Sequence, residues 1–211
     1  MKITYWSDYA CPFCYIGEKR MEKAIAELPQ LGEVQLEMKS FELDPSAPDC
    51  IEGSSIELLA QKYGMPPEEA ARQVERITQM GQADGLDMNY ESVRLGNTLD
   101  AHRLTKLAQS KGDPDLANRL IEELFQAYFS EHELLADRDL LQRIAVNCGL
   151  DAAEVDEVLD SDKYRREVKE DEREAFLHGV HMVPFFVVGE HEIVGALSVD
   201  EMKQTLMMEM R

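Results

Sequence analysis

Two cysteines near the amino terminus, Cys11 and Cys14, are separated by Pro12 and Phe13 in the stretch YWSDYACPFCYIGEKR. The pair lies where a short apolar run gives way to an amphipathic one. Thiols at this spacing hold a metal, form a structural bridge, or exchange electrons through a reversible disulfide. The other residues of the chain have to favour one of these three chemistries.

The position of Cys11 predicts a difference between the two thiols. Cys11 lies just before a predicted helix, where unpaired N–H groups and the helix dipole favour an anion, and Pro12 suits the first turn of that helix. We therefore expect Cys11 to be the exposed thiol that ionises more readily, and Cys14, one turn further in, to be buried. Pro12 and Phe13 carry no positive charge, so the helix has to be the main source of this effect.

A metal site is the weaker interpretation of the cysteine pair. Structural zinc takes about four nitrogen or sulfur ligands, usually as two close pairs, whereas the chain has one C-x-x-C pair. His178 and His181 have two residues between them rather than the usual three to five or so, and no metal site is predicted. A strand followed by C-x-x-C and a helix is typical of redox pairs, although two inert buried cysteines remain an alternative.

The other two cysteines, Cys50 and Cys148, lie far from this pair in the sequence. Cys50 lies in a loop rich in Pro, Ser and Gly, and Cys148 ends a predicted helix beside Gly149. Separation along the chain does not decide whether the two meet in space. They are interpreted as ordinary free cysteines, with regulatory thiols or a second exchange pair as alternatives.

The charge of the chain limits its partners. Its 211 residues include 22 basic and 42 acidic side chains, which gives a net charge of −20. Such a field repels nucleic-acid phosphate and anionic membrane surfaces, so neither is a predicted partner. The first residues contain no long apolar core of a secretory signal, and no apolar run approaches the roughly 20 residues that cross a bilayer. We therefore expect a cytoplasmic protein, in which a structural disulfide framework is not expected.

The pattern of apolar residues predicts strands at both ends of the chain and helices between them. Alternation over residues 2–9 and 33–43 predicts two strands around the helix that follows Pro12. Helical periodicity then continues from residue 55 to about residue 179, and its last part predicts a helix that starts at an Asp151 cap. Residues 183–189 and 191–196 predict a hairpin, and Ser198 with Glu201 predicts the cap of a closing helix.

This order of elements predicts an α/β fold that is interrupted by a large all-helical insertion. The two ends, residues 1–54 and 180–211, are expected to form one discontinuous domain. Residues 55–179 are expected to form the helical insertion domain. The opening strand–helix–strand unit is too short for anything but a simple crossover between parallel strands.

Four stretches carry a resemblance to a known family. They are YWSDYACPFCYIGEKR, SFELDP, NTLDAHRL and GVHMVPFFVVGEHEIVGA, in that order along nearly the whole chain. Together they resemble the DsbA family of thioredoxin-like oxidoreductases, and in particular its cytoplasmic FrnE-like branch. The resemblance implies a thioredoxin-like fold, with Cys11 as the attacking thiol and Cys14 as the resolving thiol.

The same resemblance implies roles for residues outside the cysteine pair. Val183-Pro184 is expected to be a cis-proline loop beside Cys11, and the peptide group of Val183 is expected to pair with an extended substrate. Pro12 and Phe13, between the cysteines, belong to the expected substrate-binding surface.

Two residues of the insertion, Asn97 and His102, look like its contribution to the rim of the active site. Alternatively, Asn97 only caps a helix and His102 only points into an interface.

The implied activity is thiol–disulfide exchange on protein or small-molecule disulfides. No Gly-rich dinucleotide fingerprint is present, so no bound cofactor is predicted, and glutathione or another dithiol is the expected electron donor. The best-known periplasmic DsbA enzymes have a histidine between their cysteines, whereas this chain has Pro-Phe. We therefore expect a reduction potential below the roughly −120 mV of DsbA.

Two other functions remain open. Glutathione-dependent isomerases of 2-hydroxychromene-2-carboxylate are relatives of this branch, but they typically carry serine where Cys11 stands. A binding or chaperone module that uses an apolar groove is the non-enzymatic alternative. The sequence does not predict the substrate or the oligomeric state.

Overall fold

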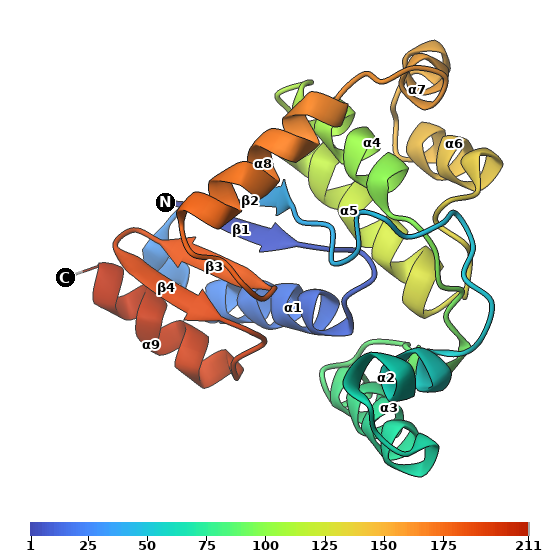
Figure 1. The fold of residues 1–211 in the computed structure, drawn as a ribbon. Helices are drawn as coiled ribbons and strands as arrows, with labels where there is room; N and C mark the ends of the chain where they lie inside the picture. The colour runs from blue at the N-terminus through green and yellow to red at the C-terminus, as the bar shows by residue number, and fades with distance from the viewer. Residues whose placement is uncertain (211) are drawn as a thin grey trace. The chain divides into compact units, whose positions relative to one another are not determined.

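A four-stranded sheet brings together strands from the two ends of the chain (Figure 1). Its order is β2-β1-β3-β4, in which β1 is parallel to β2 and antiparallel to β3, and β3 and β4 are antiparallel. The strands are β1 Lys2–Ser7, β2 Gln35–Ser40, β3 Phe185–Val188 and β4 His191–Val194. Tyr5 on the central strand β1 is paired with Met38 and Phe186, and all three side chains are buried. This arrangement confirms the predicted α/β fold and its closing hairpin.

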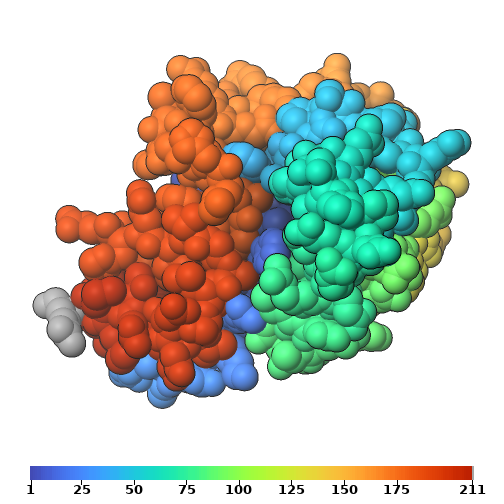
Figure 2. Space-filling view, turned by 60° about the horizontal axis from the view of Figure 1, so that its bottom comes forward, coloured from blue at the N-terminus to red at the C-terminus, as the bar shows by residue number. Residues whose placement is uncertain are grey.

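Helices cover both faces of this sheet. Helices α1 (Pro12–Ala26) and α9 (Val199–Glu209) contact each other on one face, and the second half of α8 (Arg165–Leu177) lies on the other (Figure 1). The predicted cap of the last helix is confirmed, because Ser198 and Glu201 form a reciprocal capping box. Helix α9, which belongs to the red part of the surface in Figure 2, buries Met202 and leaves Met208 exposed.

The structure, a computed structural model, describes residues 1–210, which divide into two compact units. The first, here called the sheet unit, contains Met1–Glu42 and the chain from Lys169 onward, and the second, the helical unit, contains Leu43–Val168. Both boundaries fall earlier than those expected from the sequence, and the later one does so because the second half of α8 is bonded to the sheet. The Trp6 indole donates to the main-chain oxygen of Asp171 at 3.0 Å, and the Asp171 carboxylate accepts from the Ser40 N–H at 2.7 Å.

The helical unit consists of helices whose starts follow local sequence signals. Asp113, Asp137 and Asp151 each accept two main-chain N–H groups of the first turn that follows them. The helices are α2 Ser55–Tyr63, α3 Pro67–Ala83, α4 Leu99–Gln109, α5 Pro114–Phe129, α6 Arg138–Asn147, α7 Ala152–Leu159 and the start of α8. Short 3-10 helices lie at Pro29–Leu31 in the sheet unit and at Tyr90–Ser92 in the helical unit. Within residues 1–210, no helix is both long and apolar enough to span a membrane.

A turn divides the helix that the sequence predicts beyond the Asp151 cap, so this prediction was wrong. Helix α7 ends at Leu159, and Tyr164 adopts a left-handed φ of 64° before α8 begins. The cause is Arg103 of α4, whose side chain is almost fully buried. Its guanidinium donates to the main-chain oxygens of three turn residues, namely Val158, Ser161 and Lys163.

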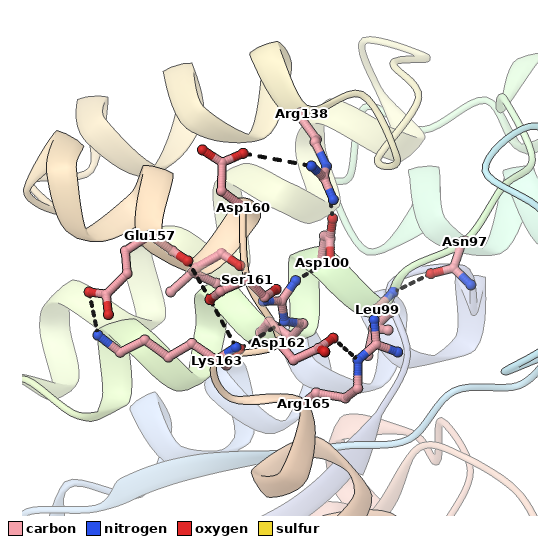
Figure 3. A network of polar contacts seen from close by, with 12 residues as sticks. Asn97, Leu99, Asp100, Arg138, Glu157, Asp160, Ser161, Asp162, Lys163 and Arg165 are labelled. Atoms are coloured by element: carbon pink, nitrogen blue, oxygen red, sulfur yellow. Dashed lines mark hydrogen bonds and ion pairs between the residues drawn. The ribbon is translucent and has the colours of Figure 1, made fainter.

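A network of acidic and basic side chains, joined by hydrogen bonds and ion pairs, surrounds this turn (Figure 3). Asp100 accepts from the Arg103 guanidinium at 2.7 Å and also faces Arg138, which lies between Asp100 and Asp160. Arg165 donates to Asp162 at 2.8 Å. The buried guanidinium of Arg103 is therefore compensated both by a carboxylate and by main-chain oxygens, as a buried charge requires.

Candidate active site

The two cysteines lie at the junction between β1 and α1. Cys11 is the residue before the first turn of α1, and Pro12 begins the helix as predicted. The Cys11 N–H donates to the Asp8 oxygen at 3.0 Å, and the Cys14 N–H donates to the Cys11 oxygen at 3.0 Å. These bonds fix a tight loop that places both cysteines at the amino-terminal end of the helix, where an anion is favoured.

Cys11 is more enclosed than the sequence predicts. Its residue surface is 5% exposed, so the expectation of an exposed thiol was wrong. The reason is a segment distant in sequence, because the Cys11 Sγ donates to the main-chain oxygen of Val183 at 3.6 Å. This contact also brings the Val183-Pro184 segment beside Cys11, as the resemblance implied.

Cys14 is fully buried, as predicted, and its pKa therefore differs from that of an exposed thiol. Burial is the largest effect and raises the pKa of Cys14 well above its usual range, and the neighbouring Cys11 thiol raises it further. The Ser7 hydroxyl and the Asp8 N–H, which lies 3.5 Å from the Cys14 sulfur, act in the opposite direction. Cys14 is therefore held as a thiol near neutral pH, close to the sulfur of Cys11.

The peptide bond between Val183 and Pro184 is cis, as expected from the resemblance. Both residues are buried, and Pro184 directly precedes β3. A Cβ atom on Gly17 would lie 2.8 Å from Pro184 Cγ, so α1 approaches this segment as closely as glycine permits. Gly17 is a site-forming residue that the sequence analysis missed, although a glycine within a helical pattern can signal such a close approach.

A buried acidic residue, Glu18, lies one turn beyond Cys14 on α1. Burial first, and then the charge of Glu18 and its hydrogen bond with Tyr5, raise the pKa of Tyr5 well above its usual range. The Tyr5 ring is stacked on Phe186 at 5.3 Å between centroids. The sequence analysis missed this pair, because a glutamate in an amphipathic helix normally indicates a solvated face.

The remaining predicted residues of the cysteine segment differ in their access to solvent. Phe13 is 38% exposed, whereas Pro12 is buried. Phe13 is therefore available to a substrate, and the substrate-binding role of both residues stays a prediction.

Asn97 and His102 belong to the helical unit. The Asn97 side chain donates to the Ala47 oxygen at 3.0 Å and accepts from the Leu99 N–H at 2.8 Å, so it fastens a loop to the start of α4. His102 lies within α4 and is fully buried. Asn97 thus has the structural role that the sequence left open, and a role of either residue at the active-site rim stays a prediction.

Cys50 and Cys148 also lie in the helical unit. Cys50 is exposed in the loop before α2, and Cys148 ends α6. Burial first, and then Glu123, raise the pKa of Cys148, while Arg119 opposes them. Neither residue lies in the sheet unit that contains Cys11 and Cys14.

Comparison with known proteins shows the family to which the chain belongs. The DsbA-like thioredoxin domain family matches residues 2–207, and the chain belongs to this family of thiol–disulfide oxidoreductases. A probable DsbA oxidoreductase from Streptomyces coelicolor has a similar solved structure, with a TM-score of 0.93 and 35% identity. The match covers 100% of this chain and 90% of that one. The uncharacterized protein YwbO of Bacillus subtilis is 26% identical over 216 residues, which cover 97% of this chain and 94% of YwbO.

More distant structures share the fold. A 2-hydroxychromene-2-carboxylate isomerase, at 16% identity, has a TM-score of 0.70 over 100% of this chain and 96% of its own. The cytosolic disulfide reductase DsbM from Pseudomonas aeruginosa, also at 16% identity, has a TM-score of 0.62 over 100% of this chain and 99% of its own. At this level of identity the similarity concerns the fold alone.

Proposed function

We propose that this protein is a cytoplasmic thiol–disulfide oxidoreductase that exchanges electrons through Cys11 and Cys14. The observation that carries the proposal is the asymmetry of the pair. Cys11 stands at the start of α1 beside the Val183 oxygen, whereas Cys14 is fully buried with a raised pKa. Such an asymmetry supports attack by Cys11 and resolution by Cys14.

The reaction proceeds in two balanced exchanges. The Cys11 thiolate attacks one sulfur of a substrate disulfide, forms a mixed disulfide and releases the other sulfur as a thiolate. Cys14 then loses its proton and attacks the Cys11 sulfur, which releases the second substrate thiolate and leaves a Cys11–Cys14 disulfide. Two electrons have passed from the protein to the substrate, and the reverse sequence oxidises a substrate dithiol.

The main chain at Val183 supports an extended substrate. Within residues 1–210, no hydrogen bond is found for the Val183 N–H, and its carbonyl faces the Cys11 thiol. A substrate strand that pairs with these two groups would bring its own sulfur to Cys11. Protein disulfides and small-molecule disulfides are both compatible with this geometry.

Glutathione or another dithiol is the proposed electron donor. The chain carries no dinucleotide-binding fingerprint of its own. The structure of the similarly folded DsbM from Pseudomonas aeruginosa has been solved with GSH, which supports glutathione as the first donor to test.

A glutathione-dependent isomerase is the second candidate, because the isomerase fold is similar to this one. The substitution Cys14→Ser separates the two functions, with Cys50 and Cys148 replaced by Ser in both proteins. As an oxidoreductase, the variant loses net glutathione-driven reduction of a disulfide-bonded peptide and stops at the mixed disulfide with Cys11. As an isomerase, it retains turnover of 2-hydroxychromene-2-carboxylate. Retained isomerisation without any reversible Cys11–Cys14 disulfide in the unsubstituted pair would replace the proposal.

A further inference from the structure

Ser7 is a fully buried polar residue at the end of β1, just before the loop that leads to the cysteines. Its residue surface is 0% exposed, and its main chain is held in the sheet, where its carbonyl accepts from the Phe41 N–H at 3.1 Å. Its hydroxyl oxygen, by contrast, has no partner at ordinary hydrogen-bond geometry among residues 1–210. Buried hydroxyls are nearly always bonded, because removing one from water without a partner costs free energy. The unbonded hydroxyl of Ser7 therefore indicates a role other than stabilising the fold.

The nearest reacting group to this hydroxyl is the sulfur of Cys14. The peptide group that joins Ser7 to Asp8 has its carbonyl bonded to Phe41, and its N–H lies 3.5 Å from the Cys14 sulfur. Burial, and after it the Cys11 thiol, raises the pKa of Cys14, whereas the Ser7 hydroxyl, as a hydrogen-bond donor, and the Asp8 N–H lower that pKa. The Ser7 hydroxyl thus lies against the sulfur of the resolving cysteine.

A thiol and a thiolate differ in what they offer to this hydroxyl. The sulfur of a thiol is a weak acceptor, so the hydroxyl gains little from Cys14 while that residue keeps its proton. A thiolate is an anion, and hydrogen bonds to ionised groups are about twice as strong as those between neutral groups. The resolving step creates this anion in a fully buried place. An interaction that strengthens only at that moment accelerates the step, whereas one already made in the resting protein does not.

We propose that the Ser7 hydroxyl is a catalytic hydrogen-bond donor that stabilises the Cys14 thiolate during its attack on the mixed disulfide. This inference rests on the proposed function and deepens it, because it adds a residue to the second exchange. In that step Cys14 loses its proton, a bond forms between the two cysteine sulfurs, and the bond between Cys11 and the substrate sulfur breaks. The substrate leaves as a thiolate and takes up a proton, which balances the one that Cys14 loses. The hydroxyl keeps its own proton throughout.

The test compares Ser7→Ala with the protein that retains Ser7, with Cys50 and Cys148 replaced by Ser in both. Each reduced protein is mixed with oxidised glutathione at increasing concentrations and quenched with acid at intervals. Mass spectrometry then measures the dithiol, the mixed disulfide and the internal disulfide. Formation of the mixed disulfide becomes faster as the glutathione concentration rises, and its rate reports attack by Cys11. Conversion to the internal disulfide does not depend on that concentration, and its rate reports resolution by Cys14.

We expect Ser7→Ala to slow resolution about fivefold at neutral pH, because loss of a hydrogen bond to a charged group leaves less of Cys14 as thiolate. The effect is not larger because the thiolate that remains is more basic and therefore a better nucleophile. Attack by Cys11 should keep its rate, since the hydroxyl acts on the other sulfur. The midpoint of urea unfolding should stay the same or rise, because the resting protein loses no hydrogen bond.

Ser55→Ala is a matched control in the helical unit. Ser55 is the first residue of α2 and is 0% exposed, and its hydroxyl oxygen likewise has no partner at ordinary geometry within the described part of the chain. The substitution therefore removes the same buried, unbonded group from the unit that does not contain Cys14. Both exchange rates should stay unchanged in this variant.

An unchanged rate of resolution in Ser7→Ala would overturn the inference. Equal slowing of both exchanges, or a lower midpoint of urea unfolding, would also overturn it, since either result would give the hydroxyl a structural role in the resting protein. Failure of the proposed function itself gives a different result. In that case even the protein that retains Ser7 forms no internal Cys11–Cys14 disulfide at any glutathione concentration.

Discussion

The two units bury ionisable groups in different ways. In the helical unit, Arg103 is buried together with its compensation, because a carboxylate and three main-chain oxygens accept its hydrogen bonds. In the sheet unit, burial instead raises the pKa of Cys14 and of Tyr5 and keeps both groups neutral. The first arrangement fixes a charge permanently, and the second keeps a proton available for chemistry.

This difference indicates what each unit contributes. A buried charge that has all its hydrogen bonds stabilises one connection, here the turn between α7 and α8. A buried neutral thiol in the cysteine pair keeps its proton until it attacks the mixed disulfide, so proton loss from Cys14 belongs to the second exchange. Substitutions in the two units should therefore separate stability from redox chemistry.

The largest expected effect is on stability, from Arg103→Met. The variant leaves Asp100 and three main-chain oxygens without their buried donor, and removing one partner of a buried ion pair costs about 3–5 kcal/mol. Urea unfolding should show this loss, while the glutathione equilibrium of the folded variant stays at the wild-type value. The exposed Arg138, which lies 3.5 Å from Asp100, provides the control, and Arg138→Met should cost less than about 1 kcal/mol. A shift in the glutathione equilibrium of Arg103→Met would contradict the separation of the two units.

The second largest expected effect is a loss of both stability and exchange rate, from Gly17→Ala in the sheet unit. In Gly17→Ala, the new methyl group would meet Pro184 Cγ at 2.8 Å. Overpacking of this kind costs about 1–3 kcal/mol, and the higher helix propensity of alanine offsets about 1 kcal/mol of it. We expect a net loss of up to about 2 kcal/mol in urea unfolding, together with slower reaction of Cys11 with a disulfide-bonded peptide. An unchanged rate at full stability would mean that the approach of α1 to Pro184 is irrelevant to exchange.

Local signals in the sequence predict much of the fold and the centre of the site. The caps at Asp151 and Ser198 follow from residue type and spacing, and the structure has both. The cysteine pair and Pro12 also lie at the predicted strand–helix junction. These features depend on neighbours within a few residues, so periodicity and capping rules are sufficient to find them.

The wrong predictions depend on contacts between distant parts of the chain. Cys11 is enclosed by Val183, and the turn before α8 is set by Arg103. Likewise, the second half of α8 belongs to the sheet unit because Asp171 bonds strand residues. A sequence pattern records which residues are apolar or polar, but not which distant main-chain group they meet.

The smallest expected effect is a pH dependence of stability that arises from Cys14. Burial raises the pKa of Cys14 in the folded, reduced protein, whereas an unfolded cysteine titrates near its usual value of about 8.5. Below that value both states carry the proton and the stabilisation is complete. As the pH rises above it, the unfolded state loses the proton first, so the free energy of unfolding falls by at most about 1.4 kcal/mol per pH unit.

Urea unfolding of the reduced protein at about pH 7.5, 8.5 and 9.5 measures this slope, because these three pH values bracket the usual pKa of cysteine. Cys14→Ala should flatten the curve between the upper two values, because the thiol that retains its proton only in the folded state is gone. Cys148→Ala is the matched control in the helical unit, and since Cys148 is only partly buried, it should flatten the curve less. A slope that survives Cys14→Ala but disappears in Cys148→Ala would reverse the comparison, because it would place the buried, proton-retaining thiol in the helical unit.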